Sequence, residues 1–397
     1  MSVYLEILRT RGVAVLVVST LLGRMPVGIN GLAVLLYVQG ATDSFGSAGL
    51  VAGALALGSA LGAPLQGRVV DRYGPTYLVP LATVHAAGLL LVWALGAAGA
   101  PIPALAAAAA IAGGGTPPTS SVLRSRWPYV LGSNPRLLTG AYALDSVMIE
   151  LIFVVGPLIV AAIVTAVGAQ AALAVSAAIG FGGTVAFVVA LRGHPGPEPD
   201  RRRPAFGIGP LASPGLRTLV IASLPVGFCL GTIEVVLPAF SAAEGDPALG
   251  GVLLAVWCAA SGISGLLYGA RPTRMPLTEQ HLRFAALLPL ASLPMVFAGS
   301  PAVMAALVVI AGVPMAPLIA SRNQLVSDVA PQGTAAEAFT WPLTALITGV
   351  SLGVAVAGSL SEESGWTAAM LAGVAVAGAG AVQIFLQRDR LEARPAT

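Results

Sequence analysis

The chain has 397 residues, of which 56% are apolar and only 9% are charged. Soluble proteins carry roughly 25% charged residues, so this composition excludes a soluble domain of this size. The formal net charge is +3, and all 20 basic residues are arginines distributed over short loops, which excludes a basic nucleic-acid-binding surface.

Apolar runs of about 20 residues recur along the chain, and each is long enough to cross a hydrocarbon core of roughly 30 Å. An outer-membrane barrel would show short alternating segments instead, so we predict an all-α membrane protein. Apolar windows and Gly/Pro breakers predict twelve transmembrane helices, at residues 12–38, 46–66, 76–98, 101–123, 138–166, 170–191, 216–240, 248–270, 281–299, 301–322, 334–360 and 366–387. Arginines precede the first run and no small-residue cleavage site follows it, so we expect an uncleaved first helix.

A long polar stretch, residues 192–215, is rich in Pro, Gly and Arg and predicts a cytoplasmic linker. It separates an N-terminal six-helix bundle, residues 1–191, from a C-terminal six-helix bundle, residues 216–397. The halves look like copies, because Pro26 in span 1 matches Pro225 in span 7 at an offset of 199. Matches between spans 4 and 10 and between spans 5 and 11 agree with this offset within two residues. Such duplication predicts two pseudo-symmetric bundles around a central site.

Loop charges predict the orientation of the chain in the membrane. With both termini in the cytoplasm, the loop arginines face inward, and the outward loops hold only the acids Asp43, Glu244, Asp246, Glu362 and Glu363. Arginine-rich inner loops are typical of helical membrane proteins. We therefore expect a multi-pass protein of the cell (plasma or inner) membrane. The inward-loop arginines of this prediction include Arg124, Arg126 and Arg322.

A charged turn between spans 2 and 3 carries the pattern G-x-x-x-D-R-x-G, formed by Gly67, Asp71, Arg72 and Gly74. The glycines permit a tight turn and close helix approach, and the charged pair can hold neighbouring helix ends. This pattern resembles the signature loop of the major facilitator superfamily. The resemblance implies a twelve-helix transporter whose loop is a latch that closes against the second half. The chain departs from the family at Pro75, where a basic residue is usual.

Four ionisable side chains lie inside the predicted spans, and Glu337 lies near an edge; the four are Arg24, Asp145, Glu150 and Glu234. A charge at the bilayer centre costs roughly 2.5–3.5 kcal/mol on an insertion scale, so such groups pair or line a water-filled cavity. We expect Glu150 and Glu234 to carry protons, with Arg24 as a counter-charge or substrate anchor. A static Arg24–Glu150 ion pair is the alternative. Asp145 points roughly 140° away from Glu150, and either caps the helix interior or takes part in coupling.

Other residues in the spans are candidates for transport or packing. Gly156 and Pro157 in span 5 partly match the longer motif of superfamily antiporters, which favours export over import. Small-residue pairs in spans 2, 8 and 11 predict a seam between the halves: Gly58/Gly62, Ser261/Gly265 and Gly349/Gly353. Aromatic side chains that either line an amphiphile-binding cavity or contact lipid are Tyr37, Phe153, Phe228, Trp257, Phe339 and Trp341.

The sequence contains no Walker loop, metal-ligand spacing or nucleophile–base pair, so we expect no ATP use, metal, cofactor or enzymatic activity. The leading interpretation is a monomeric, proton-coupled exporter of small amphiphilic or drug-like molecules that works by alternating access. Its partners are then a small-molecule substrate, protons and the lipid bilayer. The alternatives are a transporter of a polar metabolite, such as a sugar or amino acid, and a non-transporting membrane receptor or scaffold.

Overall fold

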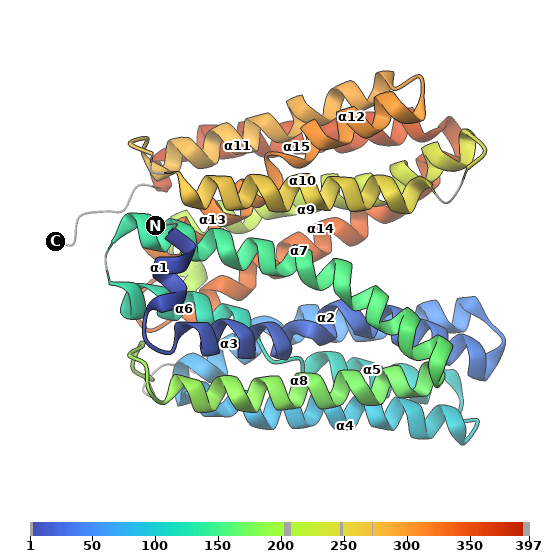
Figure 1. Ribbon diagram of the computed structural model, residues 1–397, viewed down its shortest axis with the longest axis horizontal. Coiled ribbons are helices and arrows are strands. Elements are labelled where there is room, and N and C mark those ends of the chain that lie inside the picture. The colour runs from blue at the N-terminus through green and yellow to red at the C-terminus, as the bar shows by residue number, and fades with distance from the viewer. Residues whose placement is uncertain (1–2, 133, 202–207, 247–248, 272, 392–397) are drawn as a thin grey trace.

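The computed structural model describes residues 3–132, 134–201, 208–246, 249–271 and 273–391, and these residues form helices without strands (Figure 1). The N-terminal half contains α1 (Val3–Arg9), α2 (Val13–Thr42), α3 (Phe45–Tyr73), η1 (Pro75–Tyr77), α4 (Leu78–Ala97), α5 (Ile102–Gly114), α6 (Thr119–Leu131), α7 (Pro135–Ala166) and α8 (Ala169–Leu191). The C-terminal half contains η2 (Gly209–Ala212), α9 (Pro214–Ala243), α10 (Leu249–Ala270), α11 (Leu277–Ser292), η3 (Leu293–Phe297), α12 (Pro301–Gly312), α13 (Met315–Val329), α14 (Ala335–Ser364), α15 (Trp366–Leu386) and η4 (Arg388–Arg390).

The predicted all-α membrane fold, with twelve spans in two six-helix bundles, is confirmed. Within the described ranges, 10 helical segments are long and apolar enough to cross a membrane. Two further spans are interrupted: α5 and α6 are separated at residues 115–118, and α11 passes directly into the 3-10 helix η3. With these two included, the described residues form twelve spans.

The break between α5 and α6 follows from the local sequence. Glycines precede it, and Pro117 and Pro118 lack the backbone N–H that a continuous helix needs. His85 from α4 bonds the end of α5, because its Nδ1 lies 2.7 Å from the carbonyl oxygen of Ala112. That oxygen only accepts, so Nδ1 donates and Nε2 accepts from Nδ2 of Asn30 at 3.1 Å. The break is therefore part of a satisfied polar network.

Glycines matched between the halves pack helices in the same way in both bundles. A Cβ on Gly113 of α5 would overlap the carbonyl oxygen of Leu55 in α3. Its counterpart Gly312 of α12 would place a Cβ 2.7 Å from the carbonyl oxygen of Trp257 in α10. Both helices can approach their neighbours only because these positions lack a side chain.

The prediction that three small-residue pairs form the seam between the halves is wrong for two of them. Gly58 and Gly62 pack against α5, within the N-terminal bundle. Gly349 and Gly353 pack against α9, within the C-terminal bundle. Small residues serve close packing wherever two helices cross, and sequence does not say which crossing they serve. The third pair does meet the other half, since a Cβ on Gly265 would contact Val147 of α7.

The two bundles are packed together at the end of the molecule where α1 and α6 lie, which we call the α1 end (Figure 1). One apolar core fills the C-terminal bundle and continues into residues of the N-terminal half near this end, including Ile7, Val70 and Tyr142. A second core, which includes Ile29 and Val34, stays within the N-terminal bundle. The apolar core is therefore continuous between the halves only towards the α1 end.

Candidate gating and transport site

The last turns of α3, which extend through the residues expected to form a turn, pack against the N-terminus of α14 at the α1 end. Asp71 accepts hydrogen bonds from two backbone N–H groups of α14, those of Ala336 (2.9 Å) and Glu337 (2.8 Å). Thr334, the residue before this helix, makes no side-chain cap bond. A carboxylate at a helix N-terminus satisfies unpaired donors and interacts favourably with the helix dipole. Asp71 therefore caps a helix of the opposite bundle.

An ion pair between the halves lies beside this cap. Nη2 of Arg68 lies 2.7 Å from Oε1 of Glu337, whose side chain is fully buried. Gly67 permits this approach, because a Cβ at that position would lie 2.7 Å from Cα of Glu337. Helix α3 ends at Gly74, whose φ of +94° favours glycine. The motif thus serves three purposes where α3 meets α14: Gly67 allows the helices to approach, Asp71 caps α14, and Gly74 ends α3.

Arg72 contributes differently from the other charged residues of the motif. Its guanidinium lies 5.1 Å from the centroid of the Tyr73 ring, a cation–π contact. Among the described residues it forms no ion pair. Arg68, which the sequence pattern did not single out, supplies the cation of this contact. We call the contact of Gly67, Arg68 and Asp71 with α14 the gate.

Asp145 of α7 holds two arginines in the N-terminal bundle. Its Oδ1 lies 2.7 Å from Nη1 of Arg24 in α2, and its Oδ2 lies 2.6 Å from Nε of Arg124 in α6. All three side chains are buried. Arg24 therefore pairs with Asp145, and the alternative of a static Arg24–Glu150 ion pair is wrong. Glu150 faces α10 of the other bundle, where it accepts a hydrogen bond from Ser261.

The prediction that Arg124, Arg126 and Arg322 lie in inward loops is also wrong. All three are buried in helices, the first two in α6 and the third in α13. These helices extend spans 4 and 10 beyond their apolar parts, and the surrounding helices cover the polar extensions. Arg124 is therefore a buried cation of the N-terminal bundle rather than a loop residue.

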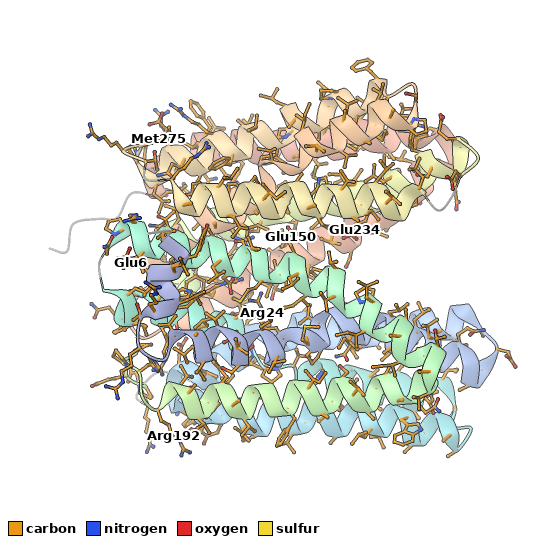
Figure 2. All side chains as sticks on the ribbon, viewed as in Figure 1. Glu6, Arg24, Glu150, Arg192, Glu234 and Met275 are labelled. Carbon is orange, nitrogen blue, oxygen red and sulfur yellow. The ribbon has the colours of Figure 1, made fainter. Side chains whose placement is uncertain are left out.

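Glu150 and Glu234 approach the same stretch of α10 from opposite bundles. Oγ of Ser261 donates a 2.8 Å hydrogen bond to Oε1 of Glu150. Cys258, one turn earlier on α10, lies close enough to both carboxylates to interact with their charges. Figure 2 shows both glutamates along the boundary between the bundles. Neither glutamate forms an ion pair within the part of the chain that the structure describes.

Gly156 and Pro157 lie inside α7, which remains helical through both residues. A Cβ on Gly156 would lie 2.5 Å from the carbonyl oxygen of Gly28, so these glycines pack α7 directly on α2. This contact lies within the N-terminal bundle. The link between the Gly-Pro pair and export stays a prediction.

Three of the six aromatic candidates lie along the contact between the halves. Phe153 is 53% exposed and stands three residues after Glu150, so it shares the helix face of that carboxylate. Phe339 lies at the gate, where its ring centroid is 6.2 Å from that of Tyr142. Nε1 of Trp341 donates a 3.4 Å hydrogen bond to the gate acid Glu337.

The other three aromatic candidates lie inside single bundles. The hydroxyl of Tyr37 donates to the carbonyl oxygen of Trp93 at 2.6 Å, between α2 and α4. The backbone of Phe228 in α9 packs against Gly353 of α14. Trp257 of α10 is buried beside Gly312 of α12. The structure does not bring these three side chains together with the carboxylates.

A short helix before the first span adds another contact between the halves. The hydroxyl of Tyr4 in α1 donates a 2.5 Å hydrogen bond to the carbonyl oxygen of Leu266 in α10. Burial raises the pKa of Tyr4 to about 12, so the phenol remains a donor at neutral pH. Val3 and Ile7 are buried on the same helix. Sequence reasoning missed α1 because it has only 7 residues and precedes the first apolar run.

Comparisons with known proteins agree with this architecture. The sequence profile described as Major Facilitator Superfamily matches residues 16–280. No curated protein matches the chain in sequence. The fold is similar to that of the human organic anion transporter MFSD10, with 15% identity, a TM-score of 0.70, and 96% of this chain and 98% of that chain covered.

Two further solved structures have a similar fold. A bacterial homologue of the iron transporter ferroportin, in an outward-facing state, has 13% identity and a TM-score of 0.77, with 95% of this chain and 99% of that chain covered. The E. coli fucose:proton symporter has 13% identity and a TM-score of 0.71, with 99% and 100% covered. At these identities the likeness shows the fold alone.

Proposed function

The chain belongs to the major facilitator superfamily, whose members are transporters rather than enzymes, and we propose that it is a proton-coupled exporter of small amphiphilic molecules. The observation that carries this proposal is the placement of Glu150 and Glu234. They come from different bundles: Glu150 bonds Ser261 of α10, and Glu234 lies near Cys258 of the same helix. Neither has an arginine partner among the described residues. Such carboxylates can bind a proton or a positively charged substrate group in turn.

The coupling role of the two glutamates is supported by the pairing of the buried arginines with a different acid. Arg24 and Arg124 both form ion pairs with Asp145, so neither neutralises the charge of Glu150 or Glu234. Val147, Phe153 and Val154 share the helix face of Glu150, and the ring of Phe153 is exposed. An apolar surface beside an uncompensated carboxylate suits a substrate with an apolar body and a cationic or polar end.

The gate supports alternating access around these carboxylates. The contacts of Asp71 and Arg68 with α14, and of Tyr4 with α10, join the halves at the α1 end. Separation of these contacts would open that end and admit substrate between the bundles, as expected when two six-helix units rock around a central site. The molecule then works as a monomer, since both bundles lie in one chain.

The loop charges support placing the α1 end in the cytoplasm and the protein in the cell membrane. Exposed arginines border this end, including Arg9, Arg192 and Arg283. The opposite end carries acids instead, among them Asp43 directly after α2 and Glu362 in the last turn of α14. This asymmetry is the one that the positive-inside rule describes.

Transport in proteoliposomes with an imposed pH gradient tests the proposal. The purified full chain is screened against a cationic dye, a sugar and a panel of amino acids. We expect gradient-driven movement of the dye, and loss of that movement in Glu150→Gln and in Glu234→Gln while both variants remain folded. Glu279→Gln is the matched control, because Glu279 is an exposed acid of α11 and should leave transport unchanged.

The same assay separates the other candidate functions. Movement of the sugar or an amino acid, without the dye, would identify a transporter of a polar metabolite. Full pH-driven dye transport by both glutamine variants would discard the coupling role of the glutamates. Absence of transport of every compound would favour a receptor or scaffold.

A further inference from the structure

Arg322 of α13 is a buried cation without an acidic partner in the described chain. Its side chain is 5% exposed. Its Nη1 donates to Oγ of Ser223 at 3.2 Å and its Nη2 donates to Oδ1 of Asn323 at 3.4 Å, and both acceptors are neutral. Its Nε has no hydrogen-bond partner. Burial of an uncompensated charge is strongly unfavourable, so this environment indicates a missing anion.

Comparison of the two duplicated halves shows which charged partner Arg322 lacks. Arg322 lies 198 residues after Arg124, within the offset that relates the two halves. Arg124 has a carboxylate partner, since its Nη2 lies 2.5 Å from Oδ2 of Asp145. The positions 197 to 199 residues after Asp145 are occupied by Pro342, Leu343 and Thr344. The C-terminal half therefore has the cation of this pair and lacks its acid.

Neighbouring charges do not compensate Arg322. The charged groups that act on it most strongly are Arg124 and Asp145 of the opposite bundle. Asp145 already binds Arg24 and Arg124, so the three arginines and one aspartate carry a net charge of +2. His281 of α11 lines the same cavity as Arg322, and its Nδ1 lies 3.1 Å from Oγ of Ser321. The local field therefore favours an anion.

A small cavity adjoins the guanidinium inside the C-terminal bundle. Ser223, His281 and Arg322 form its polar wall, and the remaining lining residues are the apolar side chains Leu219, Ala222, Val226, Leu318, Ile319 and Ile384. The space suits about one small ion or water molecule, and it is too small for an amphiphilic substrate.

We propose that Arg322, with Ser223 and His281 at the wall, forms a binding site for a small monovalent anion such as chloride or formate. The guanidinium offers strong, charge-assisted N–H donors to such an ion. One anion would compensate Arg322 as Asp145 compensates Arg124. This site is separate from Glu150 and Glu234, and it does not depend on the proposed transport function.

Thermal unfolding of the purified full chain in detergent tests the site. Sodium chloride or sodium formate is titrated against sodium gluconate at constant ionic strength. We expect a saturable rise in Tm, because a ligand that binds only the folded protein stabilises it by mass action. Arg322→Gln should abolish the rise, and Arg283→Gln, an exposed arginine of the same bundle, should retain it. A rise with chloride alone identifies a halide site, and a rise with formate also identifies a site that accepts carboxylates.

Ser223→Asp provides a second variant that keeps the arginine. A carboxylate at this position stands next to Nη1 of Arg322 and takes the place of the anion. We expect this variant to have a higher Tm than the wild type in gluconate and to show no further rise with chloride. Direct binding of radioactive chloride should be at least about tenfold weaker than in the wild type, or about 1.4 kcal/mol.

Three results would overturn the proposal. The first is a wild-type Tm that neither chloride nor formate raises above its value in gluconate. The second is a full rise in Arg322→Gln. The third is equal chloride binding by Ser223→Asp and the wild type, which decides the matter even when Arg322→Gln does not fold.

Discussion

Asp145 binds two guanidinium groups from α2 and α6, and all three side chains are buried. Asp145→Asn removes the charge that both arginines share and leaves two buried cations without a counter-charge. Breaking a buried pair from one side costs about 3–5 kcal/mol. We expect the free energy of unfolding to fall by about this amount, as measured by thermal or denaturant unfolding in detergent.

The exposed ion pair of Arg283 and Glu279 is the matched control for the Asp145→Asn substitution. These side chains lie 2.6 Å apart but are 62% and 47% exposed. Exposed pairs contribute about 0–1 kcal/mol, so Glu279→Gln should change stability very little. An Asp145→Asn variant as stable as the control would contradict the account of the buried cluster.

At the scale of elements, the position of α14 against α3 depends on the absence of a side chain at Gly67. In Gly67→Val, the new Cβ would lie 2.7 Å from Cα of Glu337, and a backbone atom cannot move without its helix. We expect α14 to separate from α3, with loss of the Asp71 cap and of the Arg68 ion pair. Spin labels at Arg192 and Arg283, in a background without native cysteines, should report a longer distance at the α1 end.

Gly53→Val on the same helix is the control for this substitution. Nothing lies within 4 Å of a Cβ at Gly53, so the added methyl groups meet no other helix. The label distance at the α1 end should then match that of the parent protein. An unchanged distance in Gly67→Val would show that α14 does not rely on this close approach.

At the scale of the whole molecule, the twelve spans and their pairing into halves were predictable because lipid imposes a length and a composition on each span. Which charged side chains form ion pairs with one another was not predictable from the sequence. Arg24 and Asp145 are 121 residues apart, and the identity of their contact depends on how α2, α6 and α7 pack. Arg124 was assigned to a loop because sequence shows the polarity of α6 and not the helices that cover it.

The candidate site was predictable in part for a related reason. Acids inside apolar runs are rare enough to mark Glu150 and Glu234 from sequence, and both lie along the boundary between the bundles. Their roles stay predictions. The gate acid Glu337 was noted only as a residue near an edge, because its partner Arg68 is 269 residues away.

The burial of the gate has a consequence for ionic strength. Asp71 and Glu337 are 8% and 0% exposed, so dissolved ions have little access to the bonds that hold the α1 end shut. Salt screens exposed charges over a Debye length of about 10 Å at 0.1 M and about 3 Å at 1 M, and buried pairs much less. The spin-label distance at this end should therefore stay constant across that range of salt. A gate held by exposed pairs such as Arg136 and Glu6 would instead loosen as the salt concentration rises.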